Sequence, residues 1–347
     1  EGEVGAGDGK GWVAGTTPGP DGKAIVHLLP GEYDVSVRLP GAPDATVPAI
    51  TVTDVGADPV SLTANAAGWM RVRVKDPEGN SITAALTLQS GHGAALGASA
   101  FGYRAIEGGD RAFPIEPGNY TANVSRGLVW TLDRHDVTVE AGKVVVVDAV
   151  VAPAVDTTGF RMINTHEHTE WSADSQTTVE DRVWNAIANG VDVMIATDHD
   201  HFGTRQPTIE ALGLTDQVHS ITGCEVSPMW GHSTAAGCRK PPAYETYYSV
   251  DFVEYDETGT MTRLSTAAEL HKQAREEFDC VFLGVNHPYR SEGTFNLYKI
   301  DGTSDPALAE PDLDLHLVDA MQVNNKSDDI DSIQSNNLPA WFNLLNS

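Results

Sequence analysis

The segment TVEDRVWNAIANGVDVMIAT, residues 178–197, joins a helix signal to a strand signal. Thr178 precedes an amphipathic run with early acidic residues, and Gly190 follows that run, so the pattern predicts a capped helix. The apolar stretch from Val191 to Thr197 predicts a buried strand. Further predicted strands (160–164, 221–226, 281–285 and 318–323) alternate with predicted helices (208–212, 265–278 and 338–345). This alternation predicts an α/β barrel or a wound sheet for residues 157–347.

The chain before this region is rich in Gly, Pro, Val and Thr and shows no sustained helical period. It also contains an internal repeat, in which Pro30-Gly31-Glu32-Tyr33 recurs as Pro117-Gly118-Asn119-Tyr120. Pro-Gly favours a tight turn, and the following Tyr is expected to start a strand. We therefore predict two small all-β sandwiches, over residues 1–65 and 66–153, similar to prealbumin-like or carboxypeptidase-regulatory-like modules. Such modules either contact carbohydrates or other surfaces, or act as structural spacers.

Composition limits the classes of partner. The 347 residues include 49 acidic and 22 basic side chains, for a formal charge of −27, which disfavours binding to nucleic acid. No apolar run approaches the roughly 20 residues that a membrane helix needs. The three cysteines are too few for a disulfide scaffold, although Cys224 and Cys238 are candidates for one pair in an oxidising compartment. The β-modules and the acidic balance predict an extracellular or periplasmic location.

Histidines and carboxylates follow the predicted strands of the second half. His166 and His168 follow the strand at 160–164, His199 follows the next strand, Glu225 lies in the third, and His287 follows the strand at 281–285. Side chains two residues apart in an extended segment point the same way, so His166 and His168 can address one metal ion. Because strand ends converge on one face of a βα barrel, these side chains are expected to gather there.

The four motifs that carry these residues resemble the PHP (polymerase and histidinol phosphatase) metallohydrolases, most closely the carbaryl-hydrolase-like branch. The motifs are His166-Glu167-His168 with Asp174, Asp198-His199-Asp200-His201, Glu225 with Gly231-His232, and Asn286-His287-Pro288. The resemblance covers residues from about 156 to 347 and implies a distorted seven-stranded βα barrel with two to three divalent metal ions (Zn, Mn or Fe). It implies His166, His168 and Glu225 for a first metal, Glu225, His232 and His287 for a second, and Asp174 and His199 for a third.

The resemblance also implies supporting roles. Asp198 and His201 are expected to orient the ligands, and Arg290 is a candidate to hold an anionic oxygen of the substrate, or else a surface ion pair. The family closes its site with a Ser-Asp-x-His motif on the final strand, and no such motif follows Val323 in this sequence. The expected barrel therefore lacks its last strand, as in a C-terminally truncated domain. Gln322 also stands where the family commonly has Glu.

Two functions follow from the sequence. The first is a metal-dependent hydrolase of a small ester, with phosphate mono- or diesters as the first choice and carbamate or carboxylic esters as the second. In such an enzyme a metal-bound hydroxide attacks the ester, and neighbouring metals stabilise the developing oxyanion. The alternative is an extracytoplasmic structural or adhesive protein that carries a vestigial, metal-stabilised PHP barrel.

Overall fold

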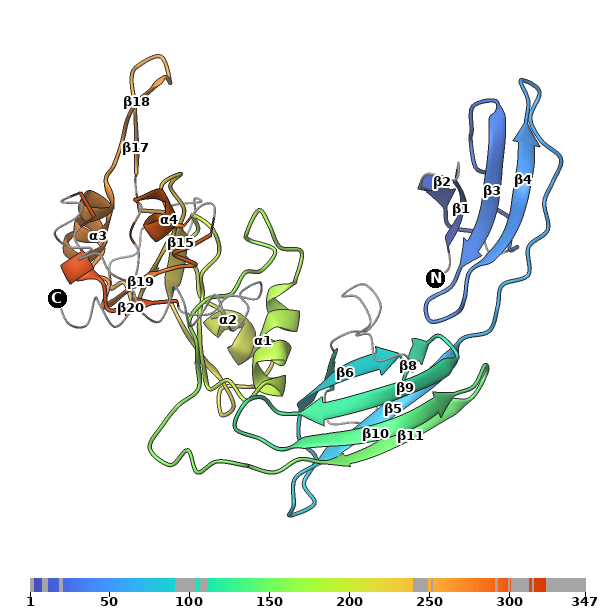
Figure 1. Ribbon diagram of the computed structural model, residues 1–347, viewed down its shortest axis with the longest axis horizontal. Coiled ribbons are helices and arrows are strands. Elements are labelled where there is room, and N and C mark those ends of the chain that lie inside the picture. The colour runs from blue at the N-terminus through green and yellow to red at the C-terminus, as the bar shows by residue number, and fades with distance from the viewer. Residues whose placement is uncertain are drawn as a thin grey trace. The chain divides into compact units, whose positions relative to one another are not determined.

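The computed structural model describes residues 3–7, 12–18, 21–90, 104–106, 112–239, 249–250, 252–290, 293–298, 300, 312–313 and 315–322 (Figure 1). The predicted helix at 338–345 lies outside these residues. The chain divides into two compact units. The first unit is Glu1–Thr157 with Ala188–Gly190, and the second unit is Thr158–Ile187 with Val191–Ser347.

The first unit begins with a four-stranded antiparallel sheet. Its strands are β1 (Glu3–Gly7), β2 (Trp12–Thr16), β3 (Gly31–Arg38) and β4 (Ala45–Val52), in the order β2-β1-β3-β4. Few of the side chains in this sheet are buried. The buried apolar side chains are those of Ala6 and Val37. Within the described part of residues 1–65 there is thus one sheet, where two facing sheets were predicted.

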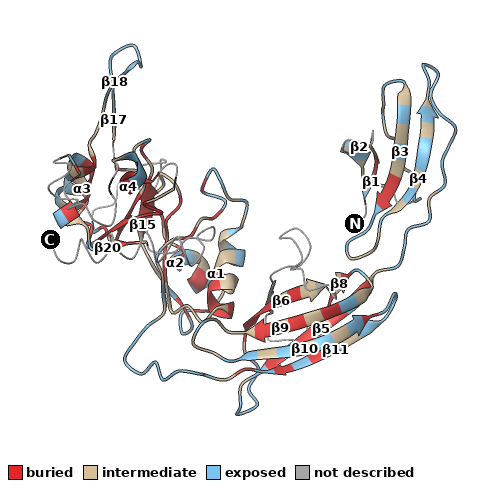
Figure 2. Cartoon of the chain, viewed as in Figure 1, coloured by how far each residue is buried: buried red, intermediate tan, exposed pale blue. Residues whose placement is uncertain are grey.

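The described strands between residues 68 and 150 form a β-sandwich. One sheet has the order β10-β9-β6-β7 and the other has the order β11-β5-β8. The strands are β5 (Gly68–Lys75), β6 (Ala84–Ser90), β7 (Arg104–Ile106), β8 (Ala112–Ile115), β9 (Gly118–Ser125), β10 (Leu132–Val139) and β11 (Val144–Val150). Burial alternates along β5 (Figure 2). Its buried Met70, Val72 and Val74 pack with Leu86, Leu88 and other apolar residues in one core. The predicted β-sandwich character is confirmed here.

The internal repeat has the same local structure in both copies. β3 and β9 each begin at the repeat's Gly, and the Tyr two residues later bonds back to the chain. The Tyr33 hydroxyl donates to the Leu29 carbonyl at 3.0 Å, and the Tyr120 hydroxyl donates to the Glu116 carbonyl at 2.7 Å. The Tyr ring lies against the Gly, at 3.3 Å from a Cβ built at Gly31. In both copies the repeat therefore forms a turn, closed by the Tyr hydrogen bond, that leads into a central strand of its sheet.

The second unit holds short strands and four helices among its described residues. The strands are β12 (Ile163–Asn164), β13 (Val193–Ile195), β14 (His219–Ile221), β15 (Gly223–Val226), β16 (Ser233–Ala236), β17 (Val253–Tyr255), β18 (Met261–Leu264), β19 (Phe282–Val285) and β20 (Ala320–Met321). The helices are α1 (Val179–Ala188), α2 (Gln206–Ala211), α3 (Ala267–Glu276) and α4 (Thr294–Leu297), with a 3₁₀ turn at Leu315–Leu317. None of the described helices is long and apolar enough to cross a membrane.

The caps predicted for α1 are present. The Thr178 hydroxyl accepts the Asp181 backbone N–H at 3.1 Å, and Gly190 closes the helix with φ +65°. Val183 and Ile187 on one face of α1 pack with Met194 of β13. The sequence signals of the opening segment thus hold in detail.

The predicted (β/α)₇ PHP barrel is wrong for the described residues, which form small separate sheets. β12, β13 and β14 make a parallel sheet, but β15, β16 and β19 pair antiparallel in the order β15-β16-β19-β20. The reason is the connection between β15 and β16, which spans only residues 227–232. A parallel crossover needs about 10–12 residues or more, so the chain reverses there.

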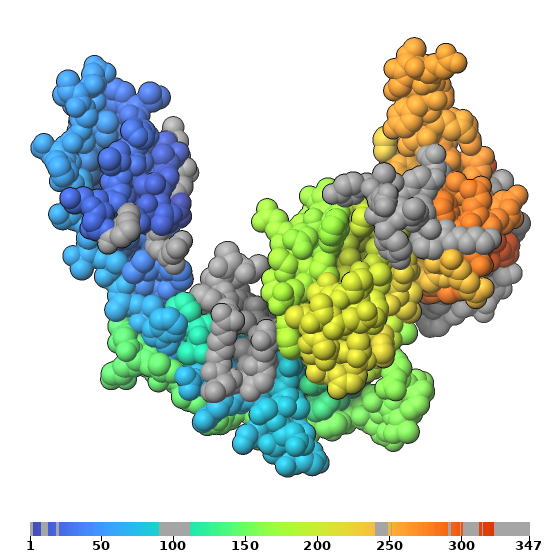
Figure 3. Space-filling view, turned by 180° about the vertical axis from the view of Figure 1, so that it is seen from behind, coloured from blue at the N-terminus to red at the C-terminus, as the bar shows by residue number. Residues whose placement is uncertain are grey.

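A disulfide joins Cys238 to Cys280, and Cys224 is a buried free thiol. The candidate Cys224–Cys238 pair is therefore incorrect. The antiparallel register of β16 and β19 sets Ala236 opposite Phe282, and continuing it by two residues brings Cys238 opposite Cys280. The β17–β18 hairpin stands out from the rest of the second unit (Figures 1 and 3), and its Tyr255 and Met261 are exposed.

Candidate metal centre

All seven predicted metal ligands lie together in the second unit. They come from the chain after β12 (His166, His168 and Asp174), after β13 (His199), within β15 (Glu225), before β16 (His232) and after β19 (His287). His199 and Glu225 also form an isolated parallel bridge, so the ends of two sheets meet at this point. The antiparallel turn between β15 and β16, with β19 beside it, brings His232 and His287 to the cluster.

Glu225 is the centre of the cluster and is completely buried. Its Oε2 lies 2.9 Å from His168 Nε2, 3.2 Å from His166 Nε2 and 3.2 Å from His199 Nδ1. Its Oε1 lies 3.1 Å from His287 Nε2 and 3.4 Å from His232 Nδ1. One carboxylate is thus surrounded by five imidazole rings.

Asp174 extends the cluster on the side of His168 and His199. Its carboxylate lies 2.8 Å from His168 Nδ1 and 3.7 Å from His199 Nε2. The Ser172 hydroxyl donates to the same carboxylate at 2.8 Å, and it accepts the His199 backbone N–H at 3.1 Å. Asp174 is the most exposed member of the cluster.

Three groups of these residues have ligand atoms within 4.8 Å of one another. They are His166 with Glu225 and His287, His168 with Asp174 and His199, and His199 with Glu225 and His232. The grouping differs from the one that the family resemblance implies, because His168 lies with Asp174 and His199, and because His166 and His287 share one group. Glu225 belongs to two groups, as expected for a bridging carboxylate.

The ligand atoms are arranged as expected for coordination of a divalent metal, and their direct contacts with one another are unfavourable. His166 Nε2 and His168 Nε2 face each other at 3.0 Å, although two imidazole lone pairs repel unless a proton or a metal lies between them. Glu225 Oε2 is buried and has no hydrogen bond of proper geometry among the described residues, although three ring nitrogens surround it. Imidazole and carboxylate are ligands for Zn, Mn and Fe. The residues therefore fit a metal of this kind.

The charges of the cluster suit a cation. Burial alone would raise the pKa of Glu225, but interactions with four of the surrounding imidazoles lower it well below its usual range. Burial likewise opposes ionisation of Asp174, yet hydrogen bonds from His168 and Ser172 lower its pKa to about 2. Burial lowers the pKa of His199, which favours the neutral ring that a metal needs.

The three residues with predicted supporting roles lie near the cluster in different ways. Asp198 is fully buried and accepts the Thr169 backbone N–H at 2.6 Å, so it fixes the chain beside His168. His201 stacks on Trp171, with ring centroids 5.3 Å apart and an interplanar angle of 7°. The Arg290 backbone N–H donates to the His287 carbonyl at 3.0 Å. The anion-binding role of Arg290 stays a prediction.

Several residues that contact the ligands carried no assigned role in the sequence. The Ser227 hydroxyl lies 2.6 Å from His199 Nδ1, and Asn286 Nδ2 donates to Glu225 Oε1 at 2.7 Å. Gln322 Oε1 accepts the His287 backbone N–H at 2.9 Å. Ser227 stands two residues after Glu225, and strand periodicity could have placed both side chains on one face.

The backbone is constrained at the ligands. His287 has φ +26°, an uncommon conformation for a residue with a side chain, and Gly231 before His232 has φ +146°. A Cβ at Gly231 would lie 2.0 Å from Thr294 Oγ1. Glycine is required there because α4 packs against the chain that carries His232. Such constrained positions cluster at functional sites.

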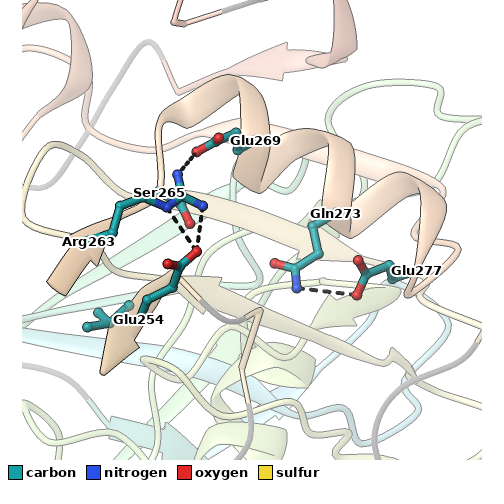
Figure 4. Close-up of a pocket in the computed structure, with 7 residues that line it drawn as sticks. Glu254, Arg263, Ser265, Glu269, Gln273 and Glu277 are labelled. Atoms are coloured by element: carbon teal, nitrogen blue, oxygen red, sulfur yellow. Dashed lines mark hydrogen bonds and ion pairs between the residues drawn. The ribbon is translucent and has the colours of Figure 1, made fainter. Parts of the chain in front are cut away.

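A separate pocket of about 250 Å³ lies between the β17–β18 hairpin and α3 (Figure 4). Arg263 projects into it, and its guanidinium lies 2.8 Å from Glu254 and 2.7 Å from Glu269. Gln273 bonds Glu277 farther along α3. The charged groups are therefore already paired, and none of the seven clustered residues lines this pocket.

The contribution of His168 to the metal-free fold and the contribution of bound metal are expected to respond to pH in opposite directions. Burial alone would lower the pKa of His168, but hydrogen bonds and charge from Glu225 and Asp174 raise it. Protonated His168 therefore stabilises the metal-free fold below its ordinary pKa, and this stability is lost as pH rises through the raised pKa. Metal binding requires neutral imidazole, so stabilisation by metal grows over the same rise.

Thermal unfolding of the second unit, followed from about pH 6 to about pH 8 with Zn²⁺ and with chelator, tests this opposition. The two melting curves should move apart as the pH rises. Parallel shifts would show that metal does not compete with protons at these imidazoles.

Comparisons with known proteins add only distant likenesses. No protein-family model and no curated protein matches the chain. Among solved structures, it is similar to GBS52, the minor pilin of Streptococcus agalactiae, at 13% identity over 45% of this chain and 83% of that chain, with a TM-score of 0.23. It is similar to the Bacillus anthracis TIE protein at 13% identity, over 44% of this chain and 31% of that chain, with a TM-score of 0.22. It is similar to the pilus adhesin SpaC of Lactobacillus rhamnosus GG at 13% identity, over 45% of this chain and 29% of that chain, with a TM-score of 0.18.

The predicted ester hydrolase is corrected, because the described residues do not form the PHP barrel on which the prediction rested. Because the TM-scores lie far below 0.5, the likenesses carry no argument about what this chain binds.

Proposed function

We propose that this chain is an extracytoplasmic structural or adhesive protein whose second unit is stabilised by two to three bound divalent metal ions. The observation that carries the proposal is the environment of Glu225. Its buried carboxylate has five imidazoles within 3.4 Å, and its Oε2 lacks a hydrogen bond of proper geometry among the described residues. A buried carboxylate amid ring nitrogens is costly unless a cation satisfies all of them.

A metal at this place would cross-link the second unit. The seven ligand residues are spread from His166 to His287, and short strands of two separate sheets hold them. Ligands from distant segments make binding energy part of the folding energy, since the unfolded chain cannot present the same site. The short, mainly two- to four-residue strands of this unit explain why it would depend on such links.

The structural or adhesive part of the proposal rests on the first unit and the disulfide. The β-sandwich at residues 68–150 has a closed apolar core, as an independently stable spacer requires. Its finer role, contact with carbohydrates or with another surface, belongs to the same proposal. The Cys238–Cys280 disulfide supports an extracellular or periplasmic location, because disulfides persist in oxidising compartments.

Metal content and thermal unfolding test the stabilising role. With Zn²⁺ at about 100 times its dissociation constant, binding should stabilise the second unit by about 2.7 kcal/mol and raise its melting temperature. EDTA should reverse the shift. A variant with His168→Ala and His199→Ala removes ligands from two of the three groups, so it should bind fewer metal ions and show a smaller shift.

His219→Ala is the matched control, because His219 is an exposed histidine on β14 outside the cluster. It should keep both the metal and the thermal shift. Equal metal content and equal melting in the double variant, the control and the wild type would contradict the proposal.

A further inference from the structure

A buried charged layer lies directly behind the candidate metal centre. It consists of Glu167, Asp198 and Arg205, which are 4%, 0% and 2% exposed. Arg205 Nη1 lies 2.7 Å from Asp198 Oδ2, and Arg205 Nε donates to Glu167 Oε1 at 3.4 Å. A buried guanidinium between two carboxylates is rare and is stable only when its charge is compensated.

The two carboxylates flank the ligands in the sequence. Glu167 stands between His166 and His168, and Asp198 immediately precedes His199. Because their neighbours point toward the metal centre, the carboxylates point to the opposite side of the chain, where Arg205 lies. Arg205 therefore links the segment after β12 to the segment after β13, which are the two segments that carry three of the imidazoles.

Short hydrogen bonds complete this link. The Glu167 backbone N–H donates to Thr197 Oγ1 at 2.6 Å, and the Thr197 hydroxyl donates to the Glu167 carbonyl at 2.7 Å. The Thr169 backbone N–H donates to Asp198 Oδ1 at 2.6 Å. Movement of the Asp198 carboxylate would thus shift the backbone at Thr169, next to His168, and the Thr197 bonds tie the Glu167 backbone to the segment that carries Asp198.

Arg205 is itself held by its surroundings. Its backbone N–H donates to Ser220 Oγ at 2.8 Å, and it begins α2 as the N-cap residue. A guanidinium presents a rigid fork of donors, so it can bond two carboxylates at fixed separation, whereas an ammonium is a single point. The backbone position of Arg205, from which its guanidinium extends, is therefore set by β14 and α2 and not by the metal ligands.

We propose that Arg205 is a positioning residue, which clamps Glu167 and Asp198 and so holds the His166–His168 segment and His199 in the register that metal binding needs. This inference rests on the proposed metal binding and adds the residue that preorganises the site. Partners that orient metal ligands typically change metal affinity by about 10- to 100-fold when they are removed.

Arg205→Met tests the clamp, with Arg275→Met as the matched control. Arg275, like Arg205, pairs with a carboxylate, that of Asp319, and it bonds the backbone carbonyls of Cys280 at 2.9 Å and Leu317 at 2.8 Å; among the described residues it has no bond to the segments that carry the ligands. Hydrogen exchange of the metal-free protein is measured for the peptide at residues 164–170, and Zn²⁺ affinity is measured by competition with a chromophoric chelator.

Arg205→Met should speed amide exchange at Glu167 and Thr169 and weaken Zn²⁺ binding by about 10- to 100-fold. Arg275→Met should lower the melting temperature while leaving both readouts at the wild-type value. Arg205→Lys should behave like Arg205→Met, because the single nitrogen of an ammonium does not reproduce the fixed, separated donors of the guanidinium. Full rescue by Lys would overturn the two-point clamp.

Unchanged exchange at residues 164–170 together with unchanged Zn²⁺ affinity in Arg205→Met would overturn the proposal, even if the variant melts earlier. Failure of the proposed function looks different. In that case the wild type binds no Zn²⁺, but Arg205→Met still speeds exchange at residues 164–170, and the clamp stands without the metal.

Discussion

Glu225→Gln is expected to abolish metal binding at the two ligand groups that share Glu225 while leaving the fold of the second unit in place. The amide has nearly the shape of the carboxylate, but it lacks the negative charge and one acceptor. Glu225 belongs to two of the three ligand groups, so its loss affects both. We expect the affinity for Zn²⁺ to fall on the order of a thousandfold, which corresponds to about 4 kcal/mol.

The matched control is Glu254→Gln, which makes the same chemical change on β17 in the same unit. Glu254 pairs with Arg263 at the surface and lies outside the cluster. This control should bind Zn²⁺ as the wild type does. If calorimetric titration gave Glu225→Gln the same affinity and stoichiometry as the control, Glu225 would not be a ligand.

Removal of the disulfide is expected to produce the largest loss of stability. The Cys238–Cys280 bond closes a loop with a sequence separation of 42 residues. In the chain-entropy model, a loop of about 40 residues corresponds to about 4 kcal/mol of stabilisation. The double variant Cys238→Ala, Cys280→Ala should therefore unfold its second unit at clearly lower denaturant, and reductant should change it no further.

The free thiol provides the control for this experiment. Cys224 is buried in the same apolar cluster as Cys238 and Cys280, so Cys224→Ala tests the loss of a buried sulfur without loss of a cross-link. A buried substitution of this size should cost about 1 kcal/mol. Equal urea midpoints for the two variants would contradict a stabilising disulfide.

The ligands could be predicted from the sequence because they follow local signals. His166, His168, His199 and His287 stand just after apolar segments that form strands, and the structure brings them together with Glu225. The caps of α1 and the Pro-Gly-x-Tyr corners likewise depend on a few neighbouring residues. Such features need no knowledge of the rest of the fold.

The arrangement of the sheets could not be predicted in the same way. Ser233–Ala236 has only small polar and apolar residues and no strong strand signal, yet it forms β16 between β15 and β19. Once β16 is missed, the six residues 227–232 are not seen as a reversal, and a parallel barrel is expected. The disulfide was missed for the same reason, since its partners are opposed only through the register of β16 and β19.

Arg205 was missed for a different reason. It lies in a short polar stretch, Gly203-Thr204-Arg205-Gln206, where an exposed arginine is the usual expectation. Only its near-complete burial and its contacts with Glu167 and Asp198 indicate a role. Long-range charge compensation of this kind leaves no local pattern in the sequence.

Anomalous diffraction from crystals grown with Zn²⁺ tests the central claim most directly. Data collected on both sides of the zinc absorption edge should show one or more peaks within about 2.0–2.2 Å of a Glu225 oxygen and of the imidazole nitrogens around it. A peak of this kind is the predicted result. Fully occupied zinc elsewhere on the chain, with no anomalous density among His166, His199, Glu225 and His287, would contradict the proposed metal centre.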